Sequence, residues 1–388
     1  MTRLQERKIV EETAERVNED FMAYLTYIQE NEIKLAKKSA HISRKDCFAI
    51  NQKLKCQPED WEKPTRVQET YIEIDFFYYC CLRFGLYRLV KQGNGYRFEE
   101  NDCLQEFLEL DSVTRYCLFL AILLGEYADI VERGVFLMSA GGIMDALKTT
   151  AAGDPVKDVF GRDYWLADYK YNPSVKLIAL LGLTNIIWLQ DSDMLKSAKA
   201  CNLSANGLGI YVAKKIDHKK RLHQESEPVE YLWKRFCTLW GGNEEGKKFL
   251  DDKAEDQTGS IFYMTVSVAG CIRKIKIRGN WTLSDLHNCI QKAVDFDNDH
   301  MYCFTVGHDK FKKEYFHPYC QEQRYLADEV MIGELPLEKG SVFSYLFDFG
   351  DSWYFDIKVD KIVEEEFDGV EIIEAIGKAP EQYNMCEW

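Results

Sequence analysis

The sequence predicts an α+β protein: a mostly helical N-terminal part, followed by a C-terminal α+β domain with a mostly antiparallel sheet and one main helix. Two observations lead to this class. Through most of the first 240 residues, apolar side chains recur at helical spacing, as Phe21, Leu25 and Ile28 do in NEDFMAYLTYIQE. Beyond residue 260 they alternate with polar ones instead, as in IFYMTVSVAG, which is typical of half-buried strands.

The N-terminal part begins with helices. After the segment 18–30, a second helix is expected in ISRKDCFAINQKL, where Ser43 is a suitable N-cap and Asp46 stands three positions later. YIEIDFFYYCCLRFGL, residues 71–86, is apolar nearly all round, and we therefore expect a buried helix that ends at Gly85.

A strand, a Gly-Asn-Gly turn at 93–95 and a returning strand follow that buried helix. A weaker copy of this pattern runs over 177–216. It consists of a helix, the pair Gly182-Leu183, a short apolar strand, a polar segment and a segment that returns into a further helix. The order is that of the back half of a winged helix-turn-helix. It favours tandem winged-helix-like units, and the alternative is an irregular helical domain containing one hairpin. The expected domains are a first unit at 1–125, a second at 126–240, a linker at 241–260 and the α+β domain at 261–388.

The C-terminal domain should consist of several strands and one helix. The helix is expected in WTLSDLHNCIQKAVDF, where Thr282 and Asp285 form the capping-box pattern. HMYCFTV, SVFSYLFDF and WYFDIKVD read as strands, the last with Trp353, Phe355 and Ile357 on one face. A helix packed on such a sheet is a common α+β arrangement.

Composition narrows the function classes. The 388 residues include 46% hydrophobic and 29% charged ones, and the first twenty have no apolar core, so we expect a cytoplasmic protein without membrane contact. None of the 13 cysteines falls in a C-x-x-C pair, which favours reduced thiols. Of the net charge of −15, −13 lies between Asp251 and the C-terminus. Such an acidic region is suited to a protein partner rather than to nucleic acid.

The near-neutral N-terminal part contains the candidate DNA contacts, which are two groups of basic residues. The candidate phosphate-binding residues are Lys34, Lys37, Lys38, Arg44, Lys45, Lys214, Lys215, Lys219, Lys220 and Arg221. The first group precedes the second expected helix, where basic charge would position a recognition element on DNA. The alternative is a solvated helix face.

The stretch YLFDFGDSWYFDI raises the question of an acidic site, because Asp348 and Asp351 flank Phe349 and Gly350. A protein kinase is excluded, since no H-R-D loop precedes the motif and only seven residues follow Glu381. A hydrolytic or metal-dependent site would use His300, Asp348 and Asp351. The simpler interpretation is an acidic turn whose aspartates bond backbone amides.

Two H-x-x-C pairs, His300 with Cys303 and His317 with Cys320, also suggest zinc. However, residues three apart on a strand point to opposite faces, which separates His300 from Cys303. We expect neither a metal site nor a cofactor.

Three segments of the C-terminal domain resemble the plasmid pRiA4b ORF-3-like family, found on plasmids and in mobile elements. They are TLSDLHNCIQKAVDFDNDHMYCF, GSVFSYLFDFGDSWYFDI and GKAPEQY, within about 260–383. The residues that carry the resemblance as a structural signature are Asp297, Asn298, Tyr302, Phe349, Gly350 and Trp353. Phe355 departs from it, because the family usually has a histidine there. The resemblance implies a fold and a link to mobile elements, but no reaction.

These observations together favour a non-enzymatic accessory protein that binds DNA through its N-terminal part or a protein partner through its acidic C-terminal domain. The alternative is a metal-dependent hydrolase or nuclease using His300, Asp348 and Asp351. Geometry distinguishes the two: an enzyme requires His300 and Asp348 to converge in an open cleft, whereas an interaction module buries or separates them.

Overall fold

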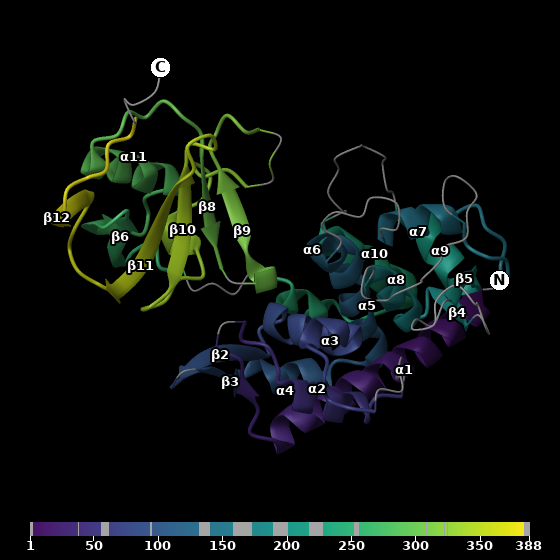
Figure 1. Ribbon diagram of the computed structural model, residues 1–388. Helices are drawn as coiled ribbons and strands as arrows, with labels where there is room; N and C mark the ends of the chain where they lie inside the picture. Colours follow the sequence, from purple (N-terminus) through teal and green to yellow (C-terminus); the bar gives the residue numbers. More distant parts are fainter. Residues whose placement is uncertain are drawn as a thin grey trace. The chain divides into compact units, whose positions relative to one another are not determined.

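A computed structural model describes residues 3–37, 39–55, 62–93, 95–131, 140–157, 173–188, 201–216, 228–251, 256–307, 309–321, 323 and 325–383 (Figure 1). The candidate residues Lys38, Lys219, Lys220 and Arg221 lie outside this set. The chain divides into two compact units, Met1–Asp251 and Asp252–Trp388. Helices dominate the first unit and a seven-stranded antiparallel sheet the second, which confirms the α+β class. In the described part of the chain, no helix is both long and apolar enough to cross a membrane.

The first unit opens with a helix–strand–helix–helix–hairpin succession. Its elements are α1 (Arg3–Glu30), β1 (Lys34–Leu35), α2 (Arg44–Asn51), the 3-10 helix η1 (Gln68–Thr70), α3 (Ile72–Arg83), β2 (Tyr87–Gln92), β3 (Gly95–Glu100) and α4 (Cys103–Glu109). The strands form an antiparallel sheet in the order β1-β3-β2. The expected cap of α2 is confirmed, because the Ser43 side chain accepts a hydrogen bond from the Asp46 amide.

Helix α3 forms the centre of this unit. Every residue from 72 to 81 is buried, as the all-round apolar sequence predicts. Phe77 of α3 packs edge-on against Phe21 of α1 with ring centroids 5.3 Å apart, and Phe119, in the helix that follows α4, lies 5.0 Å from Phe21. The helix ends where Gly85 adopts φ +65° and the Leu86 amide bonds back to the Cys81 carbonyl.

The remaining elements of the first unit are again mostly helical. They are α5 (Ser112–Ile122), the π-helical turn η2 (Leu123–Tyr127), α6 (Ala128–Val131), α7 (Ala140–Leu147), α8 (Pro173–Leu180), β4 (Thr184–Trp188), β5 (Cys201–Ala205), α9 (Gly207–Lys215), α10 (Val229–Trp240) and the 3-10 helix η5 (Glu244–Phe249). Strands β4 and β5 pair antiparallel. The range 241–260, expected as a linker, contains η5, and Phe249 packs against Phe107 of α4 with ring centroids 5.0 Å apart.

The second unit is a sheet with one main helix against it. Its elements are β6 (Ile261–Val268), β7 (Cys271–Arg278), α11 (Leu283–Val294), β8 (Tyr302–Val306), η6 (Asp309–Phe311), β9 (Lys313–Phe316), η7 (Ile332–Glu334), β10 (Val342–Phe347), β11 (Trp353–Val363) and β12 (Val370–Ile376). The strand order is β12-β7-β6-β11-β10-β8-β9, and every neighbouring pair is antiparallel.

The predicted alternation defines the core of this unit. Phe262, Met264 and Val266 of β6 are buried, as are Phe355 and Ile357 of β11, while the residues between them are exposed or partly exposed. The apolar stripe of α11 packs on this face. The capping box of α11 is also confirmed, because Asp285 accepts from the Thr282 amide and Thr282 accepts from the Asp285 amide.

Candidate functional site

Two loops that are nearly fifty residues apart in the sequence meet at one end of the sheet. Strand β8 begins where β10 ends, since Tyr302 is paired with Phe347. The loop before β8 and the turn after β10 are therefore neighbours. The Asp348 amide donates to the Met301 carbonyl at 3.0 Å, which joins the two loops through the backbone.

Asp348 organises the second loop. Its φ of +56° lies in the left-handed region, which aspartate tolerates when its side chain bonds locally. Its Oδ1 accepts from the Gly350 amide at 2.8 Å and from the Asp351 amide at 3.3 Å, and its carbonyl accepts from the Ser352 amide at 2.7 Å. The carboxylate thus closes the turn, and the residue is only 8% exposed.

His300 does approach Asp348. Its Nε2 lies 3.4 Å from Asp348 Oδ2 and 3.6 Å from Asp299 Oδ1, and its side chain is 41% exposed. Asp351 is exposed and joins this arrangement through its backbone amide. Among the described residues, no three His, Cys, Asp or Glu side chains are placed to hold a metal ion.

The C-terminal segment fastens the first loop. Gln382 accepts from the Asp297 amide at 2.5 Å and donates to the Asp297 carbonyl at 3.1 Å. Tyr383 donates its hydroxyl to Asp299 at 2.8 Å, and this hydrogen bond to a carboxylate raises the pKa of Tyr383 to about 12. The loop geometry is therefore held from both sides.

Behind these loops lies a buried polar network centred on His287 of α11. His287 is 2% exposed, and burial lowers its pKa to about 4, so the ring is neutral. Its Nε2 is 2.6 Å from Asn298 Oδ1, which can only accept, and therefore Nε2 carries the proton. Its Nδ1 then accepts from the Tyr345 hydroxyl at 2.6 Å, and that hydroxyl accepts from Gln291 at 2.8 Å.

Tyr302 covers the flat side of this histidine. The two rings stack with centroids 3.8 Å apart, and the Tyr302 hydroxyl is 2.6 Å from Ser284 Oγ. His317 packs edge-on against Tyr302 at 4.9 Å. Asn298 and Tyr302, two of the signature residues, thus contact His287, which is not one of them.

The other signature residues divide between core and surface. Trp353 packs on Phe296 with ring centroids 5.1 Å apart, and its indole nitrogen is buried. Phe355, which stands where the family usually has histidine, is fully buried 5.1 Å from the Tyr345 ring. Phe349 is 42% exposed.

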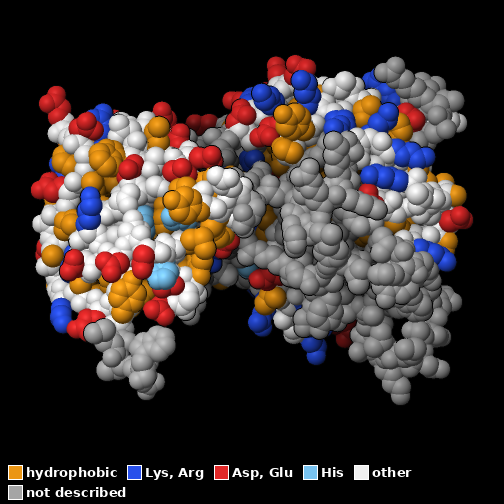
Figure 2. All heavy atoms as spheres, turned by 90° about the horizontal axis from the view of Figure 1, so that it is seen from above, with side chains coloured by type: hydrophobic (Ala, Val, Ile, Leu, Met, Phe, Trp, Pro, Cys, Tyr) orange, Lys and Arg blue, Asp and Glu red, His pale blue; other side chains and the backbone are white. Residues whose placement is uncertain are grey.

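The two loops form a surface that we call the acidic tip. Its members are Asp297, Asp299, His300, Met301, Asp348, Phe349 and Asp351. Met301 is 45% exposed, so an apolar side chain lies among these carboxylates. Figure 2 shows histidine, acidic and hydrophobic side chains next to one another on the face of this unit that is seen from above.

The candidate DNA contacts that the structure describes are exposed. Lys34 lies on β1, Lys37 follows it, and Arg44 and Lys45 occupy the first turn of α2. None of these four forms an ion pair with a carboxylate in the described ranges. In the last turn of α9, Lys214 and Lys215 are exposed as well, with Lys215 Nζ 5.6 Å from the Tyr211 ring centre.

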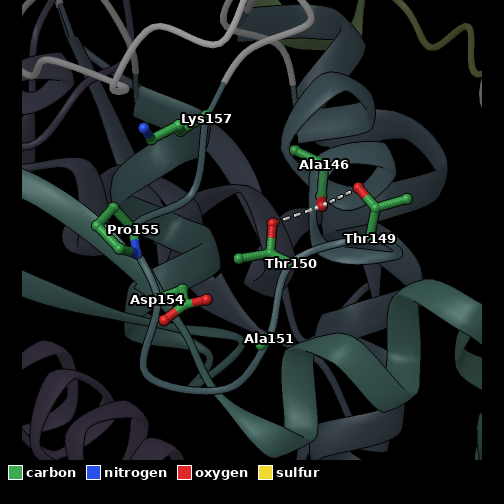
Figure 3. Close-up of a pocket in the computed structure, with 7 residues that line it drawn as sticks. All are labelled: Ala146, Thr149, Thr150, Ala151, Asp154, Pro155 and Lys157. Atoms are coloured by element: carbon green, nitrogen blue, oxygen red, sulfur yellow. Dashed lines mark hydrogen bonds between the residues drawn. The ribbon is translucent and has the colours of Figure 1, made fainter.

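A pocket of about 510 Å³ lies in the first unit, where α7 ends and the chain bridges from Pro155 to Ser204 of β5 (Figure 3). Thr149 and Thr150 both donate to the Ala146 carbonyl, at 3.3 and 2.8 Å. These hydroxyls are therefore engaged in ending the helix. No sequence motif marked it in advance.

The fold and the hydrogen-bonded loops define an α+β domain that presents acidic loops at one end of an antiparallel sheet. The model of the family described as plasmid pRiA4b ORF-3-like protein matches residues 264–382, which confirms the resemblance seen in the sequence. The match lies within the second unit and covers somewhat less than a third of the chain.

No curated protein matches the chain. A crystal structure of a protein of unknown function from Methanosarcina mazei Go1 is similar to part of it, with 20% identity and a TM-score of 0.27 over 32% of this chain and 71% of that one.

Proposed function

We propose that the chain is a non-enzymatic binding protein whose C-terminal domain docks a cationic segment of a protein partner at the acidic tip. The main support for this proposal is that four carboxylates lie in two loops that hydrogen bonds hold in place. They belong to Asp297, Asp299, Asp348 and Asp351. Because the loops are already ordered, binding costs little conformational entropy.

Charge and apolar surface occur together at this tip. Met301 and Phe349 offer exposed area that a hydrophobic residue of the partner would cover, and the surrounding carboxylates would pair with its lysines or arginines. The acidity of the whole C-terminal region would steer such a segment towards the domain.

The polar groups of the site support binding rather than catalysis. Asp348 uses one carboxylate oxygen to close its own turn, and His287 is neutral with both ring nitrogens engaged. A general base needs a lone pair that is free to accept a proton from the substrate. The hydrogen bonds from Tyr345 and from the Gly350 amide occupy such lone pairs on His287 Nδ1 and Asp348 Oδ1.

A charge-matched pair of variants tests the tip. In the full chain, D299N/D351N removes two charges at the tip, and E329Q/E338Q removes two exposed charges elsewhere in the same domain. Calorimetric titration with a hexa-arginine peptide at 50 mM NaCl should give at least fivefold weaker binding for the first variant than for the second. Equal losses would mean that only net charge matters, and the proposed site would be abandoned.

For the N-terminal unit we propose contact with DNA phosphates. The order α1, β1, α2, α3, β2, β3 and the strand order β1-β3-β2 support a winged-helix-like unit, and exposed Lys34, Lys37, Arg44 and Lys45 supply the charge. Since α3 is buried from 72 to 81, it offers no face to read bases, and binding would be independent of DNA sequence. The plasmid in the family's name supports a link to mobile elements.

Salt dependence tests this proposal. Full-length protein should bind two unrelated 20-base-pair duplexes equally, with affinity falling steeply from 50 to 200 mM salt. The variant K34Q/K37Q/R44Q/K45Q should bind more weakly, with a salt slope lower by about 3 to 4. The control K53Q/K63Q/K234Q/K247Q removes four exposed charges elsewhere and should retain the original slope. Absence of binding at low salt would reject DNA contact.

The alternative function, a metal-dependent hydrolase or nuclease, is supported by one observation, the 3.4 Å approach of His300 to Asp348. Incubation of the full chain with supercoiled plasmid and Mg²⁺ or Mn²⁺ tests it. Cleavage by the natural protein that H300A abolishes would establish the enzyme, whereas equal traces of cleavage in both would identify a contaminant.

A further inference from the structure

The groove between α11 and β12 is a second surface of the C-terminal domain, separate from the acidic tip. It measures about 390 Å³, within the ~300–1,000 Å³ typical of ligand sites. One wall is Trp281 and the face of α11 formed by Asp285, Asn288, Cys289 and Lys292, which stand three or four residues apart. The other wall is Val370 and Ile372, two residues apart on β12.

Strand β12 ends the sheet. It pairs with β7, and no other described strand lies against its outer edge. Figure 1 shows β12 at the margin of the sheet, close to α11. A strand in this position presents unpaired backbone amides and carbonyls, which proteins usually protect with charge, bulges or cover.

Here the protection is incomplete. A register shift between Ile372 and Glu374 marks a bulge, yet Ile372, Ile373 and Ile376 are 40, 44 and 45% exposed. Three exposed isoleucines on seven residues of an edge strand are a surface suited to being covered. A strand added beside β12 would direct every second side chain towards the helix α11.

The charge around β12 identifies the occupant. Glu371 and Glu374 lie on the strand, and Glu364, Glu366 and Asp368 precede it, all exposed. Glu374 is paired with Lys274 of β7 at 2.6 Å, so among the described residues Glu371 and the preceding carboxylates carry the uncompensated charge. A second copy of the chain would place these carboxylates against one another, and like charges across a strand pair are destabilising. Lysine or arginine at the alternate positions of an added strand would instead be attracted.

We propose that this groove binds an extended peptide in which apolar residues alternate with lysine or arginine, added as a further strand beside β12. The apolar residues enter the groove over Val370, Ile372 and Trp281. The basic residues face the carboxylates of β12. Backbone hydrogen bonds to the free edge align the peptide, and the groove selects its apolar side chains.

Peptide design separates this mode from simple charge attraction. The probe is a fluorescein-labelled heptapeptide of alternating lysine and valine, titrated with the full chain by fluorescence anisotropy. One control has the same composition in two blocks. A second control is N-methylated at alternate residues, which removes backbone donors on one edge. Both controls should bind at least tenfold more weakly, and equal binding by either would overturn the proposal.

Variants locate the site. I372K places a charge in the groove and should weaken the alternating peptide at least tenfold, while V342K, which alters a 58% exposed valine on β10, should not. E371K changes only an exposed carboxylate and should weaken binding severalfold without disturbing the fold. Equal behaviour of I372K and V342K would reject the groove.

The same titration distinguishes other occupants and the acidic tip. D299N/D351N should leave this peptide's affinity unchanged. If that variant abolishes binding, the peptide binds at the tip, and this inference fails although the proposed function holds. If the chain dimerises through β12 and takes no peptide, a second copy is the occupant and the inference is overturned.

Discussion

His287 shows how burial determines the behaviour of one residue. Neutral imidazole fits its site because Nε2 donates to Asn298 and Nδ1 accepts from Tyr345. Protonation would turn Nδ1 into a donor, so that its hydrogen and the hydroxyl hydrogen of Tyr345 would face each other. It would also place a positive charge in the interior. Desolvation therefore lowers the pKa of His287 to about 4.

This shift predicts a loss of stability in acid. Between pH 6.5 and 4 the unfolded chain binds a proton at His287 that the folded chain does not, and the free energy of unfolding falls with pH. The contribution is about 3 kcal/mol, fully present above pH 6.5 and lost as the pH falls towards 4. Measured by urea titration, the free energy of unfolding of the natural protein should fall between pH 7 and pH 4 by that much more than the free energy of unfolding of H287Q. Parallel pH profiles would contradict it.

Asp348 carries a second prediction. Its φ of +56° and its bonds to the amides of Gly350 and Asp351 require a residue that accepts locally. D348N keeps such an acceptor and should cost less than about 1 kcal/mol, whereas D348A should cost about 2 kcal/mol through backbone strain and unsatisfied amides. Chemical denaturation of both variants measures the difference, and a neutral D348A would show that the turn forms without its side chain.

At the scale of elements, two helices of the first unit, α3 and α8, end in the same type of C-terminal cap. The Leu86 amide bonds to the Cys81 carbonyl after α3, and the Leu183 amide bonds to the Ile178 carbonyl after α8. Asn101 and Asn206 each donate to the carbonyl of the capping glycine, Gly85 or Gly182, at 2.8 Å. The repeated Gly-Leu of the sequence is thus a repeated cap, fastened by an asparagine after the hairpin.

Close packing at the second cap yields a prediction for helix α9. A Cβ on Gly209 would lie 1.7 Å from the Leu183 carbonyl oxygen, a backbone atom that cannot turn away. G209A should therefore displace α9 and cost about 3 kcal/mol or more. G259A is the matched control, since no atom lies within 4 Å of its new methyl group. Thermal unfolding of the two variants should differ clearly, and similar midpoints would refute the clash.

At the scale of the molecule, the two compact units predict separable folding. Each has its own core, and the boundary follows Asp251. Fragments 1–251 and 256–388 should each unfold cooperatively, and their far-ultraviolet circular dichroism spectra should sum to that of the full chain. A fragment that unfolds without a transition would show that its core needs the other unit. A cut at 125, inside the first unit, is the control and should give unfolded pieces.

The features that the sequence predicted best are those that depend on residues close together in the chain. Ser43 and Thr282 cap their helices as their spacing to Asp46 and Asp285 indicates. The resemblance of the C-terminal domain to the plasmid pRiA4b ORF-3-like family could be recognised from the sequence because each of its motifs is a short continuous segment. His287 was less visible, although its spacing of four from Gln291, beside the apolar stripe of α11, is a signal for a polar pair facing the core.

The sequence by itself determined the α+β class, the caps and the alternating faces, because propensity, capping and periodicity act within one helical turn or strand. Only the tertiary structure decided that Asp348 meets His300, that Gln382 fastens Asp297, and that α3 is covered on every side. These contacts depend on the pairing of β8 with β10 and on the packing of distant helices. Many registers satisfy the local pattern, and burial of the whole core selects one of them.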